Sequence, residues 1–245
     1  MRLAFTIFGF VIFATLGLSG CGDAPGRLAA ETMPIMPSSV SDFDTLYGAN
    51  CAGCHGADGK GGAAIALANP EYLALVDDAT LRRVASNGIH GTSMPAFAQS
   101  AGGMLTDKQI DAIARGIRER WSKADALQGA VPPPYSSTES GDAARGAEVY
   151  ATGCQSCHGS GGHGGQKGSS IVDGSFLALL SDQELRTIVI VGRPELGAPD
   201  WRGDLPGKPL SAKDVSDVVA WLASQRPQFP GQPYAGAEKS TGETP

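Results

Sequence analysis

In the first part of the chain, apolar residues recur every three or four positions, which is the spacing of one helical face. The pattern occurs from Ser41 onward, from Asp78 to Ser86, and from Thr106 to near Trp121. Gln109 stands three residues after Thr106, the arrangement of a capping box, and Gly88 follows the middle stretch as a helix-terminating residue. We therefore predict three helices in this part of the chain.

The same pattern returns in the second part of the chain. Two more capping boxes precede apolar stripes here, one formed by Ser181 with Glu184 and the other by Ser211 with Asp214. Strand-like alternation is scarce throughout. The repetition predicts two units of similar build, which we place at residues 41–123 and 142–226.

The N-terminus has the pattern of an export signal. Arg2 is followed by an uncharged apolar run from Leu3 to Leu18, as in the hydrophobic core of a signal peptide. The run ends in Leu-Ser-Gly-Cys21, which resembles the lipobox of bacterial lipoproteins. We expect residues 1–20 to be removed and Cys21 to carry the lipid; an uncleaved signal anchor is the alternative. Either reading gives an exported protein tethered to a membrane.

Proline, glycine and serine mark the segments between and after the two units. Residues 21–40 are predicted to form a flexible tether. Residues 124–141 contain three consecutive prolines and are predicted to form a stiff linker, and residues 227–245 are predicted to form a disordered tail. The net charge of −6 is mild and neither unit is basic, which argues against nucleic-acid binding. The chain holds 34 glycines, and small glycine-rich units bury little apolar surface, so each needs a stabilising group.

Two five-residue motifs carry the candidate chemistry. Cys51-Ala-Gly-Cys54-His55 and Cys154-Gln-Ser-Cys157-His158 each have the C-x-x-C-H pattern. In this pattern the two thiols bind a haem covalently and the histidine is an iron ligand. A zinc ribbon would need the second pair about 15–20 residues after the first, and a thioredoxin-like dithiol would follow a strand. A disulfide inside each pair would leave the histidines unexplained. The motifs predict two covalently bound haem c groups.

The sixth ligand of the first haem is predicted to be Met94. It precedes Pro95 in a stretch between two predicted helices, and a thioether is a soft ligand that raises the reduction potential. Met104 and His90 are the other candidates in this region.

With these motifs, each unit resembles a class I c-type cytochrome, and the whole resembles the dihaem cytochrome c lipoproteins of bacterial respiratory chains. The resemblance covers residues 41–123 and 142–226. It implies an all-α fold of two small cytochrome c domains in tandem, each around a haem. It also implies that the first and last helices of each domain cross, near Phe43 and Ile117 and near Gly146 and Leu222.

The second unit departs from this family pattern at one position. Aligning Ser93–Phe97 with Gly197–Trp201 places Ala198 where the axial methionine is expected, and no methionine follows Met104. The second iron is then open or water-ligated, or ligated by His163, or by a residue from elsewhere in the chain. Three nearby residues have two possible roles: Arg193, Trp201 and Arg202. They either bind the haem propionates, or they are two surface arginines and a packing tryptophan.

These observations predict a membrane-tethered electron carrier on the periplasmic face of a bacterial membrane, inner or outer. Its partners would be a quinol-oxidising complex and a terminal oxidase or other acceptor. Two alternatives stay open: a haem enzyme or sensor in which the second haem binds or reduces peroxide or nitric oxide, and a fixed subunit of a larger oxidoreductase. No nucleophile–base pair or carboxylate dyad is visible, so a hydrolase has no support.

Overall fold

The structure is a computed structural model that describes residues 34–227, apart from 204 and 206. Cys21, the predicted signal peptide and the predicted tail after residue 227 lie outside the described residues. The chain divides between Ser39 and Val40 into two units. In the first unit the structure describes one short 3-10 helix, η2 (Pro37–Ser39).

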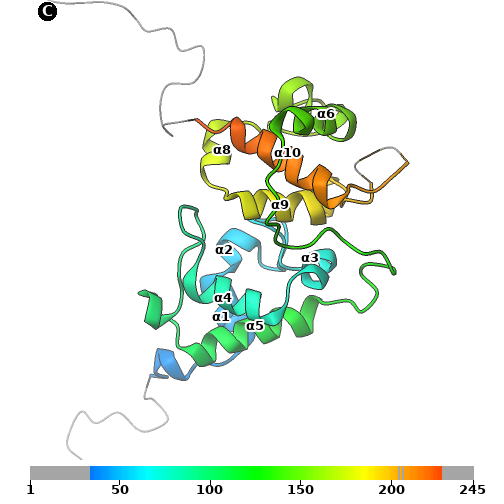
Figure 1. Cartoon of the computed structure of the whole chain (residues 1–245). Helices are drawn as coiled ribbons and strands as arrows, with labels where there is room; N and C mark the ends of the chain where they lie inside the picture. Colours follow the sequence, from blue (N-terminus) through cyan, green and yellow to red (C-terminus); the bar gives the residue numbers. More distant parts are fainter. Residues whose placement is uncertain (1–33, 204, 206, 228–245) are drawn as a thin grey trace, which may run out of the picture. The chain divides into compact units, whose positions relative to one another are not determined.

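The second unit contains both motifs, and its described residues form helices, turns and three isolated β-bridges (Figure 1). We call residues 40–123 the first half and residues 142–227 the second half. The first half contains α1 (Phe43–Asn50), α2 (Ala52–His55), α3 (Pro70–Leu75), α4 (Asp78–Asn87), η3 (Gln99–Ala101) and α5 (Asp107–Trp121). The second half contains α6 (Ala143–Gly153), α7 (Gln155–His158), η4 (Ser160–Gly162), α8 (Gly174–Ala178), α9 (Asp182–Val191), η5 (Pro194–Leu196) and α10 (Ala212–Ser224).

The three predicted capping boxes are confirmed. Thr106, Ser181 and Ser211 each accept a hydrogen bond from the backbone N–H three residues on, and the side chain at that position closes the box. The first helix is capped by Asp42 and not by Ser41, because the Asp42 carboxylate accepts from the backbone N–H of Thr45.

The first and last helices of each half pack closely, as the family resemblance implied. In the first half a Cβ on Gly116 of α5 would lie 2.1 Å from the Phe43 ring of α1. In the second half a Cβ on Gly146 of α6 would lie 2.0 Å from the carbonyl oxygen of Asp217 in α10. The close approach is made by a glycine in both halves, but on the last helix in one and on the first helix in the other.

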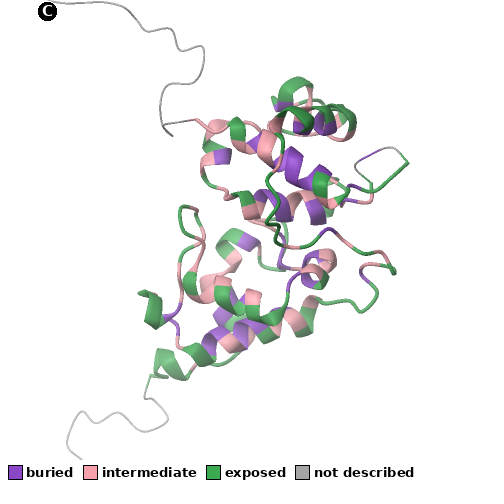
Figure 2. Ribbon diagram, in the orientation of Figure 1, coloured by how far each residue is buried: buried purple, intermediate pink, exposed green. Residues whose placement is uncertain are grey.

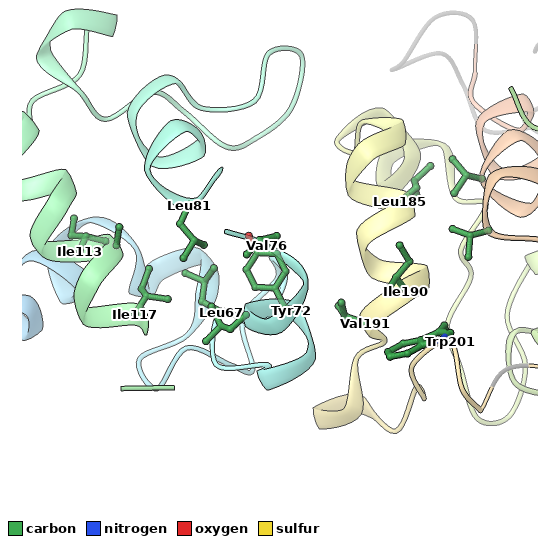
Figure 3. Packing of buried hydrophobic residues seen from close by; sticks show 14 of the residues in the cluster. Leu67, Tyr72, Val76, Leu81, Ile113, Ile117, Leu185, Ile190, Val191 and Trp201 are labelled. Carbon is green, nitrogen blue, oxygen red and sulfur yellow. The ribbon is translucent and has the colours of Figure 1, made fainter. Parts of the chain in front are cut away.

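The buried apolar side chains form one contiguous cluster that spans both halves. Figure 3 shows Ile113 and Ile117 of α5 beside Leu81 and α3, and a second group of Ile190, Val191 and Trp201 at the end of α9. In α10 the residues from Asp214 to Val219 are all buried (Figure 2).

Residues of the predicted linker are hydrogen-bonded to α9 of the second half. The buried Arg186 of α9 donates from Nε and Nη2 to the carbonyl oxygen of Pro134, at 3.0 and 2.9 Å. Gln183 donates to the carbonyl oxygen of Tyr135 at 2.7 Å. Desolvation lowers the pKa of Arg186, but a guanidinium stays charged at all ordinary pH values, and these carbonyls are its partners.

Candidate haem sites

Each C-x-x-C-H motif forms one short helical turn directly after the first helix of its half. In the first half, Cys54 and His55 both donate backbone N–H groups to the carbonyl oxygen of Cys51, at 3.2 and 3.0 Å. In the second half, Cys157 and His158 donate to Cys154 at the same distances. This turn places the two cysteines and the histidine on one side of the backbone. Among the described residues, no disulfide involves these four cysteines.

Each motif histidine is held by a backbone carbonyl through one ring nitrogen. Nδ1 of His55 lies 2.8 Å from the carbonyl oxygen of Ile65, and Nδ1 of His158 lies 2.9 Å from that of Ser169. A carbonyl can only accept, so Nδ1 carries the proton and Nε2 keeps its lone pair for a metal. Burial lowers the pKa of His55, which further favours the neutral ring that a metal needs.

A tyrosine supports the residue after each histidine. The Tyr47 hydroxyl donates to the carbonyl oxygen of Gly56 at 2.8 Å, and the Tyr150 hydroxyl donates to that of Gly159 at 2.5 Å. Burial raises the pKa of both phenols, so both stay protonated donors. The sequence showed both tyrosines four positions before a motif, but their bonds became visible only in the structure.

The loops that carry Met94 and Ala198 share a backbone hydrogen bond at equivalent positions. We call residues 88–97 the Met94 segment and residues 192–202 the Ala198 segment. In the first, the N–H of Ile89 donates to the carbonyl oxygen of Met94 at 3.0 Å; in the second, the N–H of Arg193 donates to that of Ala198 at 3.1 Å. The donor residue, Ile89 or Arg193, comes directly after a glycine with φ of +65° at the end of a helix. Ala198 therefore stands where Met94 stands.

A cavity in the second half brings the motif and the Ala198 segment together. Cys154 and His158 line it from one element, and Ala198 and Pro199 line it from the other. The rest of the lining is mainly apolar: Tyr150, Ile171, Phe176, Leu185, Ile188, Val189, Gly192, Arg193, Val218 and Leu222.

The other predicted site residues lie away from this arrangement. His163 is exposed and is not among the residues that line the cavity. In the first half, Met104 is 83% exposed and His90 is exposed, whereas Met94 is half-buried. Trp201 is 2% exposed, and the guanidinium of Arg202 lies over its ring, 4.8 Å from the centroid.

The Ala198 segment also contacts the first half, which the sequence did not reveal. Nη2 of Arg193 donates to the carbonyl oxygen of Gly62 at 3.1 Å, and Nη2 of Arg202 reaches Oε1 of Glu71 at 3.4 Å. Asn69, 3% exposed, donates to the carbonyl oxygen of Val191 at 3.1 Å. Asn-Pro at residues 69–70 signals a helix start, but nothing local signals its distant partner.

The family model described as "Cytochrome C oxidase, cbb3-type, subunit III" matches residues 39–115 and 141–222 of this chain, which is well over half of it. The chain belongs to this family. Its all-α fold is that of two cytochrome c domains in tandem, and the prediction of a c-type cytochrome is confirmed. Membership implies covalently bound haem c, and the family model matches a segment around each motif.

Relatives of this cbb3-type subunit III family member include respiratory proteins. The cbb3-type cytochrome c oxidase subunit FixP of Bradyrhizobium diazoefficiens is 28% identical over 181 residues, which cover 70% of this chain and 57% of that protein. The cytochrome bc1 complex cytochrome c subunit of Mycobacterium tuberculosis is 23% identical over 212 residues, or 80% of this chain and 70% of that protein. The chain spans little more than half the length of that FixP relative.

Among solved structures, a reducing HAO-like protein complex from Kuenenia stuttgartiensis is 16% identical, covers 76% of this chain and 96% of that one, and has a TM-score of 0.45. Within residues 34–227, apart from 204 and 206, no helix has the length and apolar character to cross a bilayer.

The residues present fit the covalent haem that the family implies. Each half offers two thiols on one helical turn and an imidazole whose Nε2 is free to ligate. In the second half Cys154 and His158 line a mainly apolar cavity. Gly168 also leaves room for the His158 ring, because a Cβ at this position would lie 2.9 Å from Nδ1 of His158 and displace the ring.

Proposed function

We propose that the chain binds two haem c groups and transfers single electrons for respiratory redox complexes. The observation that carries this proposal is the repeated site geometry: the same cysteine turn, the same Nδ1–carbonyl bond and the same tyrosine support occur in both halves. Haem, when bound, supplies an iron that accepts and releases one electron.

The chain's own residues have three tasks in this function. The cysteines fix each haem in place, and the carbonyls of Ile65 and Ser169 hold the histidine rings in orientation. The apolar lining excludes water, and low local polarity disfavours the oxidised state, which carries the greater positive charge. Met94 as a thioether ligand would give the first half the higher reduction potential.

The haem number is tested by comparing the native protein with two variants. The double substitution Cys51→Ala/Cys54→Ala and its counterpart Cys154→Ala/Cys157→Ala should each reduce the haem content, measured as the pyridine haemochrome per chain, from two to one. A redox titration of the native protein should show two one-electron centres. A native content of one haem per chain would contradict the proposal.

We further propose that the protein works as a subunit of a membrane redox complex, because the relatives named above are subunits of an oxidase and of a bc1 complex. Anchoring through a lipid on Cys21, on the periplasmic face, would place it there. Purification after mild solubilisation distinguishes this from a free carrier, since a subunit co-elutes with partner proteins. Replacement of Cys21 by Ser should release the protein from the membrane fraction if the lipid is the anchor.

A further inference from the structure

The Ala198 segment shares a backbone hydrogen bond and a preceding glycine with the Met94 segment, but it lacks the methionine. A methyl group cannot bind iron, so the bond that a methionine would add between this segment and a haem is missing in the second half. Of the side chains that line the second cavity, Arg193 has no lone pair to donate, and the Tyr150 hydroxyl is bound to Gly159. Apart from Cys154, His158 is therefore the one iron ligand that these lining residues supply.

The Ala198 segment is hydrogen-bonded to the first half through Arg193. The carbonyl oxygen of Gly62, which accepts from Arg193, belongs to a residue packed against the first motif: a Cβ on Gly62 would lie 2.1 Å from the Cys54 carbonyl oxygen. The guanidinium is oriented by Glu195, whose Oε1 lies 2.5 Å from Nε. Both side chains are at least 85% buried, so this pair lies in a poorly solvated place.

The lining of the cavity and its charge balance determine which kind of ligand could bind on the Ala198 side. Around Ala198 the lining is aliphatic or aromatic, and the positive charge of Arg193 is balanced by Glu195. Moving an anion from water into such surroundings carries a large desolvation cost, which a neutral diatomic molecule avoids. The chemistry favours a small uncharged ligand such as carbon monoxide or nitric oxide.

We propose that the second haem site binds a small neutral ligand on the Ala198 side, and that the first half holds the Ala198 segment in place, through Arg193 within it and through the bond of Asn69 to Val191 directly before it. The proposal rests on the proposed function, because it requires a haem at His158. The second site would then be a ligand-binding centre whose Ala198 segment is hydrogen-bonded, through Arg193, to a residue packed against the first motif.

The ligand part is tested with the native holoprotein, reduced with dithionite and titrated with carbon monoxide. Absorption spectra should show uptake by about half of the total haem. The variant Ala198→Met should bind carbon monoxide at least about tenfold more weakly, because the gas must first displace a thioether. As a matched control, Met94→Ala should raise uptake to nearly all of the haem.

The haem content of the same sample separates the two ways of failing. One haem per chain would overturn the proposed function. Two haems per chain with no carbon monoxide uptake would overturn the ligand site and leave the electron carrier intact.

The positioning role is tested without using the haem signal. Hydrogen exchange of the amides in residues 192–202 should be about tenfold or more faster in Arg193→Gln, because the segment loses its tie to Gly62. Asn69→Ser, which keeps the cap of α3, should give a change in the same direction. Arg82→Gln is the control, since Arg82 pairs with Asp111 inside the first half. Unchanged exchange in both Arg193→Gln and Asn69→Ser would overturn the positioning role.

Discussion

The side-chain amide of Asn69 donates to the carbonyl oxygen of Val191 across 3.1 Å, joining residues that are 122 positions apart in sequence. The same side chain accepts from the backbone N–H of Tyr72 at 3.0 Å and so caps α3. One buried residue thus starts a helix of the first half and satisfies the last turn of α9 in the second.

Substitutions of Asn69 should separate these two bonds. Asn69→Ser keeps an oxygen for the cap and removes the donor to Val191, so we expect a loss of about 1–3 kcal/mol for the unpaired carbonyl. Asn69→Ala removes both bonds and should cost about 1 kcal/mol more. Urea denaturation of the holoprotein measures both values. Equal stability of the Ser variant and the native protein would show that the bond across the halves is not formed in solution.

Glycine at residue 146 is required by the contact between α6 and α10. A Cβ there would lie 2.0 Å from the Asp217 carbonyl oxygen and 2.8 Å from Cβ of Trp221, and neither backbone atom nor Cβ can rotate away. Gly146→Ala should therefore lower the free energy of unfolding by about 1–3 kcal/mol, although alanine favours a helix.

Gly48→Ala in α1 is the matched control for this substitution. No atom lies within 4 Å of a Cβ built on Gly48, so only the helix propensity changes and the variant should be up to about 1 kcal/mol more stable. Thermal unfolding of both holoproteins gives the comparison. Two stabilised variants would mean that α6 and α10 are further apart than described.

The hydroxyl of Tyr150 should contribute to holding the second motif. Its ring stacks on Trp221 with 4.3 Å between centroids, and its hydroxyl donates to Gly159 beside His158. Tyr150→Phe keeps the stacking and leaves the carbonyl oxygen without this donor, so we expect about 1 kcal/mol lower stability. Tyr47→Phe should behave alike in the first half. Chemical denaturation followed by haem absorbance provides the measurement; a neutral effect in both variants would assign the tyrosines to packing alone.

Local patterns were sufficient for the longer helices and for the site motifs. The capping boxes at Thr106, Ser181 and Ser211 depend on residues three positions apart, and such signals are legible in a sequence. The equivalence of Met94 and Ala198 was also visible, because it depends on spacing within a repeat.

Features that depend on distant contacts were not visible. The short helices α3 and α8 were not predicted, since a helix of five or six residues has little periodicity to display. The prolines predict a stiff linker, but they do not show that Arg186 donates to its carbonyls from 52 residues away. The contacts of Arg193 and Asn69 with the opposite half have no local signature, because they come from the packing of one half on the other.

The buried Asp217 of α10 should make the second half sensitive to acid. Burial alone would raise the pKa of this carboxyl, but the Asp142 N–H at 2.7 Å and the cations of Lys213 and Arg145 outweigh it, so the net pKa is lowered. A carboxyl with a lowered folded-state pKa stabilises the protein above its unfolded pKa of about 4, and this contribution is lost as the pH falls through the folded value.

Asp217→Asn should therefore weaken the protein at pH 7 and flatten the decline of stability below about pH 4, because the variant has no carboxyl to protonate there. Asn keeps an oxygen for the Asp142 N–H, which isolates the effect of the charge on Lys213 and Arg145. Urea midpoints measured from pH 7 to pH 3, with Asp107→Asn as a surface control, test this. Parallel pH profiles for Asp217→Asn and the native protein would show that the Asp217 charge does not stabilise the α6–α10 contact.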